Sequence, residues 1–221
     1  MLKFSKLILF DIDYTLFDSR KYREKMFKDL LNKLGHKDSE FFLKKVEETY
    51  FLSKEKGAFI PAQFVNRLIK DFNLNYSSKD LEDILWKKKI FVECLYKEAE
   101  DVLRLLSKNK NIKIGIFSGG HDVFQRKKIE AIKDFFDEEH IHVFMQKDQK
   151  LKKIINKYKG LKLYYIDDVL DFLKKAKTFN KDIVTVWIKR GRYAREQAIT
   201  DFNPDKTITN LLELIPIIKE N

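Results

Sequence analysis

The sequence contains little cysteine, proline or glycine. Its 221 residues include one cysteine, three prolines and seven glycines. The single Cys94 cannot close an internal disulfide, which excludes a disulfide-stapled secreted domain and favours a reducing compartment. A Cys–His zinc cluster is excluded as well, and His140 and His142, at the start of a predicted strand, are interpreted as structural or solvated. With so little glycine and proline for linkers, we expect one substantial core, or a core with an inserted domain.

Long apolar runs are also absent from the sequence. No stretch approaches the roughly 20 apolar residues that a membrane-spanning helix needs. The first apolar run, residues 7–10, is interrupted by Asp11 and Asp13 before a signal-peptide core can form. We therefore expect a soluble, cytoplasmic protein with no membrane partner.

The charge is strongly positive, at a formal +11 from 45 Lys+Arg against 34 Asp+Glu. The basic residues are mostly lysines scattered along the chain, whereas a nucleic-acid footprint concentrates them on one face. This pattern favours solubilising charge over nucleic-acid binding, and a basic surface also attracts phosphorylated substrates. The tightest basic cluster, interpreted as a solvated loop, consists of Lys189, Arg190, Arg192 and Arg195. The oligomeric state is left open by these features.

Short apolar runs alternate with helical patterns along most of the chain. Such runs are typical of strands buried on both faces of a sheet. The runs are residues 7–10, 112–117, 141–145, 161–166 and 183–188, and the helical patterns are residues 123–136, 149–158 and 169–176. This alternation predicts an α/β fold, a doubly wound parallel sheet with Rossmann-like topology.

The interval from Ser19 to about Leu95 lacks strand-like runs and shows successive amphipathic helices. The expected helices run from Ser19 to Gly35, from Ser39 to Gly57, from Pro61 to Phe72, and from Ser77 or Ser78, with Glu82 or Asp83, to Trp86. We therefore predict an α/β core of residues 1–18 and 96–221, with a helical domain, residues 19–95, inserted after the first strand.

Polar residues follow the predicted strands at the edge where open parallel sheets bind ligands. They are Asp11, Asp13, Ser118, Lys147, Asp167 and Asp168. Carboxylates are hard ligands that suit Mg²⁺, so Asp11, Asp168 and the backbone carbonyl of Asp13 could form part of an octahedron. A carboxylate can also attack phosphorus to give an aspartyl-phosphate. A second carboxylate two residues later could protonate the leaving oxygen and then deprotonate water.

Four segments of the sequence, in order, resemble the motifs of the haloacid-dehalogenase-like (HAD) hydrolases. They are Phe-Asp11-Ile-Asp13-Tyr-Thr15-Leu for motif I, Ile-Gly-Ile-Phe-Ser118 for motif II, the lysine that opens the predicted helix at residue 149 for motif III, and Tyr-Tyr-Ile-Asp167-Asp168 for motif IV. The helical insert between motifs I and II resembles the C1 cap of subfamily I. Each motif alone is weak evidence for the resemblance, but four motifs with this spacing and this insert are specific to the family.

The resemblance implies roles for the residues of motif I. Asp11 would be the nucleophile and a metal ligand. Asp13 would be the general acid and base and would offer its backbone carbonyl to Mg²⁺. Thr15 would hold Asp13 and the turn in place. The family often has glycine where Tyr14 stands, and this tyrosine is expected to pack under the cap.

The resemblance also implies roles for the later motifs. Ser118 and the following amide would bind the transferring phosphoryl group. Lys147 would neutralise developing charge; Lys150 is the alternative, but about twenty residues from Lys147 to motif IV suit a full helix plus a strand. Asp168 would bind Mg²⁺ directly, while Asp167 would ligate the metal or orient a metal-bound water.

The carboxylate of Asp13 separates the reactions known in the family, because members that dehalogenate lack it. The predicted function is therefore that of a Mg²⁺-dependent phosphatase acting on a small phosphorylated metabolite. Sugar phosphates, phosphoglycolate and nucleoside monophosphates all stay open as substrates. The alternatives are a phosphomutase with the same site, a phosphatase of nucleic-acid ends, and a non-enzymatic interaction protein on this fold.

Overall fold

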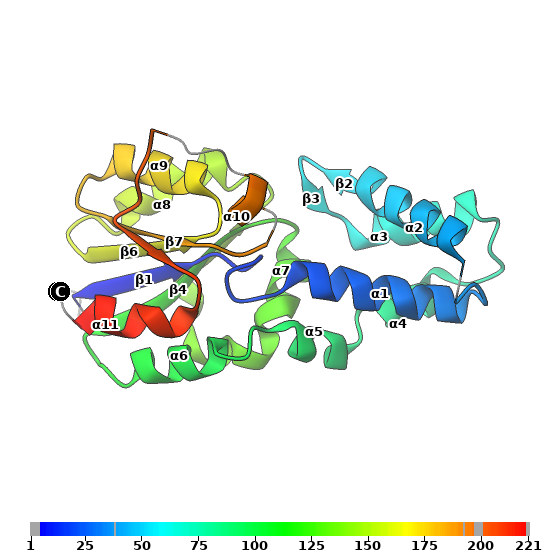
Figure 1. The fold of residues 1–221 in the computed structure, drawn as a ribbon, viewed down its shortest axis with the longest axis horizontal. Helices are drawn as coiled ribbons and strands as arrows, with labels where there is room; N and C mark the ends of the chain where they lie inside the picture. The colour runs from blue at the N-terminus through cyan, green and yellow to red at the C-terminus, as the bar shows by residue number, and fades with distance from the viewer. Residues whose placement is uncertain (1–4, 38, 192, 197–200, 220–221) are drawn as a thin grey trace.

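The computed structural model describes residues 5–37, 39–191, 193–196 and 201–219. Within these residues, six parallel strands form one sheet in the order β5-β4-β1-β6-β7-β8 (Figure 1). The strands are β1 (Lys6–Phe10), β4 (Ile112–Gly119), β5 (Ile141–Phe144), β6 (Lys162–Asp167), β7 (Val184–Ile188) and β8 (Lys206–Ile208). The chain moves outward from β1 to β5, returns to the other side of β1 with β6, and continues to β8. The predicted doubly wound α/β fold is confirmed.

The central strand β1 is apolar from Leu7 to Phe10 because helices cover both faces of the sheet. In β1, Leu7 and Leu9 belong to one core, and Ile8 and Phe10 belong to the other. On the first face lie α8 (Asp148–Lys157) and α9 (Leu170–Phe179), and on the second lie α6 (Ala99–Ser107) and α11 (Leu214–Lys219) (Figure 1). Since side chains alternate along a strand, the four apolar residues of β1 fill both cores.

The inserted segment forms a layer of helices beside the sheet domain (Figure 1). Its elements are α1 (Ser19–Lys33), α2 (Glu40–Leu52), β2 (Lys54–Glu55), β3 (Ala58–Phe59), α3 (Pro61–Asp71), α4 (Ser78–Leu85) and α5 (Lys88–Cys94). Its two connections to the sheet domain run side by side. The amide of Asp18 donates to the Cys94 carbonyl at 2.7 Å, and the amide of Tyr96 donates to the Leu16 carbonyl at 3.0 Å. Both ends of the insert therefore leave the sheet domain at one place.

The ends of the first two helices differ from prediction. Asp18, not Ser19, caps α1, because its carboxylate accepts a hydrogen bond from the Lys21 amide at 3.0 Å. Ser39 caps α2 as predicted, but this helix ends at Leu52. Gly57, with φ of +85°, instead lies in the turn of the β2–β3 hairpin, where glycine tolerates the left-handed conformation.

The remaining helices are partly as predicted. Pro61 opens α3, and Ser77 caps α4, but its capping box is closed by Asp80 rather than by Glu82 or Asp83. A helix over 123–136 was expected, whereas α7 (Asp122–Ile129) gives way to a 3₁₀ segment. The short elements are η1 (Glu130–Phe135), η2 (Glu138–His140), α10 (Tyr193–Glu196) and η3 (Leu211–Glu213). Among the described residues, none of these helices is long and apolar enough to cross a membrane.

Candidate active site

The candidate active site lies at the carboxyl end of β1, where the strand order reverses. Phe10 pairs with Ile116 of β4 and with Ile166 of β6. Asp11 therefore stands level with Asp167, and its amide donates to the Ile166 carbonyl at 2.9 Å. Ser118 of β4 and Asp168, which directly follows β6, lie one residue further along. All four of these polar residues are buried, and the sheet brings them together from three separate parts of the chain.

Lys147 links the acids of two strands. It is buried just before α8, and its Nζ lies 2.6 Å from Asp11 Oδ1 and 2.8 Å from Asp167 Oδ2. The ring of Phe172 lies beneath the ammonium, 4.3 Å from Nζ to the ring centroid. Lys150, the alternative considered for motif III, is exposed on α8. The structure thus places Lys147, and not Lys150, among the acids.

The two aspartates that follow β6 differ in their surroundings. Asp167 Oδ2 accepts hydrogen bonds from Lys147 and from the Tyr165 hydroxyl, and Asp167 Oδ1 accepts one from the Val169 amide at 2.9 Å. Both oxygens of Asp167 are therefore engaged within the protein. Asp168 Oδ2, in contrast, is buried and has no hydrogen-bond partner among the described residues. A buried carboxylate oxygen without a partner is a natural ligand for a cation.

The charges of the site fit a divalent cation. Asp11, Asp167 and Asp168 each offer a carboxylate oxygen within 4.8 Å of the others. Burial, reinforced by Asp167 and Asp13 and opposed by Lys147, raises the pKa of Asp11 to about 7. Burial together with Asp167 and Asp11 raises the pKa of Asp168 well above its ordinary value. Three carboxylates and one ammonium leave excess negative charge, and oxygen ligands of this kind suit Mg²⁺.

Asp168→Asn is expected to change how the protein responds to Mg²⁺. Because the folded protein disfavours ionised Asp168, the variant should melt at a higher temperature than wild type in EDTA at pH 7. Adding Mg²⁺ should raise the melting temperature of wild type and raise that of the variant much less. Thermal unfolding of both proteins with EDTA and with Mg²⁺ measures this. Equal Mg²⁺-induced shifts in the two proteins would exclude Asp168 as a ligand.

The turn after Asp11 is held by the backbone. The carbonyl of Ile12 accepts hydrogen bonds from the amides of Thr15, Leu16 and Phe17 at 2.9–3.3 Å. The hydroxyl of Thr15 is buried and has no hydrogen-bond partner among the described residues, so it does not hold the side chain of Asp13. The described contacts assign Thr15 a backbone role in the turn.

Tyr14 occupies this turn with a φ of +57°, in the left-handed region. This conformation explains why glycine suits the position, since a side chain there costs about 1–2 kcal/mol. The Tyr14 ring lies against Gly191 in the loop after β7, where an added Cβ would come within 2.5 Å of the ring. The ring therefore packs on the sheet domain.

Asp13 is held by residues that the sequence analysis did not identify. Lys128 Nζ lies 2.6 Å from Asp13 Oδ1, which also accepts a hydrogen bond from Ser19, and Gln125 Nε2 lies 2.7 Å from Asp13 Oδ2. Burial alone would raise the pKa of Asp13, but Lys128 and these hydrogen bonds outweigh it and lower the pKa below its ordinary value. One signal was present: Lys128 lies four residues after Phe124, on the buried face of α7.

Arg190 corrects the interpretation of the basic cluster as solvated. Its guanidinium forms an ion pair with Glu98, donates to the Thr15 carbonyl at 3.1 Å, and stacks 3.9 Å from the centroid of the Tyr96 ring. Only 10% of its side chain is exposed. It therefore connects the turn after Asp11 to the chain that returns from the insert. Lys189 is exposed as predicted. Arg192 and the side chain of Arg195 lie outside the described residues.

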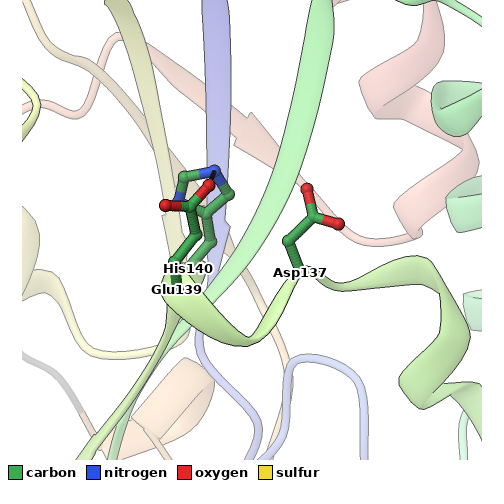
Figure 2. A group of neighbouring side chains, drawn as sticks. All are labelled: Asp137, Glu139 and His140. Atoms are coloured by element: carbon green, nitrogen blue, oxygen red, sulfur yellow. Dashed lines mark ion pairs between the residues drawn. The ribbon is translucent and has the colours of Figure 1, made fainter.

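A second group of possible ligands lies before β5 and consists of Asp137, Glu139 and His140 (Figure 2). The Asp137 carboxylate is paired with Lys113 at 2.6 Å, and Glu139 is largely exposed. The Nδ1 of His140 lies 3.0 Å from the Tyr158 hydroxyl, which also contacts His142. These partners give the group a structural role, as expected for His140 and His142.

The stability of the protein is expected to fall between pH 6.5 and pH 4 because of His142. Burial, with smaller contributions from Lys157 and His140, lowers the pKa of His142 to about 4. His142 of the unfolded chain, with an ordinary histidine pKa of about 6.5, binds a proton in this pH interval, whereas His142 of the folded protein does not. The free energy of unfolding therefore falls as the pH falls. Urea midpoints at pH 7 and pH 5 for wild type and His142→Gln measure this. Parallel losses in both proteins would contradict it.

The comparisons with known proteins agree with this geometry. No protein-family model matches the chain. The structure resembles a haloacid dehalogenase-like hydrolase from Burkholderia xenovorans, with a TM-score of 0.76 and 20% identity over 96% of this chain and 97% of that chain. The chain has the HAD fold. The fold that the four motifs imply is thereby confirmed.

Two further proteins match this HAD-fold chain over nearly their whole length. A HAD hydrolase from Bacillus subtilis, described with bound magnesium and with interdomain movement, gives a TM-score of 0.63 and 18% identity over 98% of this chain and 99% of that chain. A glyceraldehyde 3-phosphate phosphatase from Pyrococcus furiosus is 27% identical over 97% of this chain and 93% of its own length. Both similarities span the sheet domain and the insert together.

Proposed function

We propose that the protein is a Mg²⁺-dependent phosphatase that hydrolyses a small phosphorylated metabolite through a phosphoryl group carried on Asp11. The observation that carries this proposal is the contact of Lys147 with both Asp11 and Asp167, beside the unpartnered oxygen of Asp168. A buried acid with an ammonium at its side is arranged to meet a phosphoryl group. The phosphatase name of the P. furiosus relative supports the same class of reaction.

Mg²⁺ would be held by Asp11, Asp168 and the backbone carbonyl of Asp13, with Asp167 fixing the surrounding groups. The ion would supply positive charge that offsets the repulsion between the phosphoryl group and the attacking carboxylate. The magnesium reported for the B. subtilis neighbour supports this choice of metal. Lys147 adds the second positive charge of the site. Its pKa, which burial alone would lower, is raised by Asp11 and Asp167, so it stays protonated.

The reaction divides into two steps. In the first, an oxygen of Asp11 attacks phosphorus while the bond from phosphorus to the leaving oxygen breaks. Asp13, which its lowered pKa leaves ionised in the free protein, takes up the proton of the monoanionic phosphate ester and gives it to that oxygen. Ser118, whose buried hydroxyl has no hydrogen-bond partner among the described residues, and the amide of Gly119 would hold the phosphoryl oxygens. In the second step, Asp13 takes a proton from water, which attacks the phosphorus and releases phosphate and the carboxylate of Asp11.

Residues 19–95 would act as a cap that excludes water during the first step and admits it for the second. Their two adjacent connections to the sheet domain give such a movement a single hinge. The interdomain movement described for the B. subtilis protein supports this role.

Phosphate release from a panel of phosphorylated metabolites, with Mg²⁺ and with EDTA, tests the proposed function. Three-carbon phosphates belong first in the panel because the P. furiosus relative is named for one. We expect turnover of at least one metabolite that EDTA abolishes and Mg²⁺ restores. Activity that persists in EDTA would contradict metal dependence. Inert wild type, with p-nitrophenyl phosphate also unreacted, would contradict the phosphatase assignment.

A further inference from the structure

Lys128 and Gln125 hold both oxygens of Asp13 from one helix. They lie three residues apart on α7 and therefore on the same face of it. Lys128 Nζ contacts Asp13 Oδ1 at 2.6 Å, and Gln125 Nε2 contacts Asp13 Oδ2 at 2.7 Å. With each oxygen bound to a different donor, the carboxylate has a fixed position and a fixed plane.

The turn after β4 is shaped around Gln125. Its Nε2 also donates to the Gly119 carbonyl at 2.5 Å, so one amide joins Asp13 to the turn that follows Ser118. A Cβ at Gly120 would come within 2.5 Å of this Nε2, and Gly120 has a φ of +138°. Glycine at this position therefore makes room for Gln125, which makes the contact part of how the turn is built.

The charged ammonium of Lys128 is buried among apolar side chains. Only 6% of its side chain is exposed, and its Nζ lies 4.8 Å from the centroid of the Phe124 ring and 5.5 Å from that of Phe17. Among the described residues, Asp13 is the acidic residue with which Lys128 forms an ion pair. Burying an ammonium is costly unless it is paired, and a hydrophobic residue would pack here at lower cost. The placement of Lys128 is thus explained by Asp13.

We propose that Lys128 and Gln125 are positioning residues that hold the Asp13 carboxyl group where it transfers a proton to the leaving oxygen. This inference rests on the proposed function. In the step concerned, the bond from phosphorus to the leaving oxygen breaks, and Asp13 passes to that oxygen the proton that it has taken from the monoanionic phosphate ester. A displaced Asp13 would leave the attack by Asp11 intact but would leave the departing oxygen unprotonated.

The dependence of rate on the leaving group separates this role from a purely structural one. A nitrophenolate departs readily without a proton, whereas an unsubstituted phenolate or an alkoxide does not. The ratio kcat/KM reports the steps up to departure of the leaving group and excludes the later hydrolysis of the phosphorylated Asp11. A loss of kcat/KM that grows with leaving-group basicity therefore indicates impaired proton donation, while misfolding lowers all substrates alike.

The experiment compares kcat/KM for p-nitrophenyl phosphate, phenyl phosphate and the best alkyl phosphate of the panel. The variants are Lys128→Met, Gln125→Met, Asp13→Asn and the double variant Asp13→Asn with Lys128→Met. Lys127→Met is the matched control, because Lys127 is the neighbouring lysine of the same helix and pairs with Glu130 on the surface. Thermal unfolding of every variant checks the fold, and Gln125→Met, similar in size to wild type, serves if Lys128→Met does not fold.

We expect Lys128→Met to lower kcat/KM about 10²-fold for phenyl and alkyl phosphates, and less than about 5-fold for p-nitrophenyl phosphate. Gln125→Met should show the same trend more weakly, and Lys127→Met none. In the Asp13→Asn background, Lys128→Met should cause no further loss. Equal losses for all leaving groups, or additive losses in the double variant, would overturn the inference while leaving the phosphatase function intact. Wild type without Mg²⁺-dependent hydrolysis would overturn the proposed function instead.

Discussion

Asp11→Asn is expected to lower kcat at least about 10⁴-fold with every substrate. Asparagine keeps the shape of the side chain but cannot accept the phosphoryl group, so the first step of the reaction is lost. Stability should not fall, because burial and neighbouring carboxylates already disfavour ionised Asp11. Asp134→Asn, which makes the same change at an exposed position of η1, is the matched control. Phosphate release and thermal unfolding, measured side by side for the three proteins, check both expectations.

Two results would contradict this account of Asp11. If Asp11→Asn retained turnover within about tenfold of wild type, another group or water would have to attack phosphorus. If instead the variant were inactive but unfolded at the assay temperature, Asp11→Asn would be acting through the fold, against the expectation that the fold tolerates it. Asp134→Asn should match wild type in both measurements.

Lys147→Met is expected to have the second-largest effect, on both rate and stability. Methionine removes the ammonium that lies 2.6 Å from Asp11 and 2.8 Å from Asp167. Removing one partner of a buried pair typically costs about 3–5 kcal/mol, because the remaining charges stay uncompensated. Loss of a charge that stabilises the transition state costs about 10²- to 10³-fold in kcat. Urea unfolding in EDTA and steady-state kinetics with Mg²⁺ measure the two losses.

Lys150→Met is the control for Lys147→Met. Lys150 is exposed on α8, only three residues away, and was the alternative for the same role. The Lys150→Met variant should have the stability of wild type and a kcat within about twofold of wild type, as substitutions at exposed positions usually do. A larger loss of kcat in Lys150→Met than in Lys147→Met would reassign the lysine of the site.

The local sequence pattern predicts most of the sheet and much of the candidate site. Each long strand is a mostly apolar run. The runs of β1, β4 and β6 end in polar residues, so parallel pairing brings Asp11, Ser118 and Asp167 to one edge. The three-residue strand β8 and the two-residue strands β2 and β3 are too short for any such run. These elements depend on their neighbours for pairing, and local sequence does not contain that information.

The contacts that hold the motif I residues could not be predicted in the same way. Lys128 meets Asp13 across 115 positions of sequence, and Arg190 meets the Thr15 carbonyl across 175. A lysine or arginine in a basic chain is usually solvated, so composition favours the wrong interpretation for both. Only the fold places these cations against the turn after Asp11, which is why their roles emerge from three-dimensional contacts rather than from motifs.

Identification of the phosphorylated residue during turnover tests the central claim most directly. Wild type is mixed with its best substrate and Mg²⁺, quenched in acid within the first turnover, digested and analysed by mass spectrometry. The account predicts phosphate on the peptide that contains Asp11, assigned to Asp11 by fragmentation and absent from Asp11→Asn. Phosphate found on another residue, or rapid turnover with no phosphorylated peptide under conditions that preserve acyl phosphates, would contradict it.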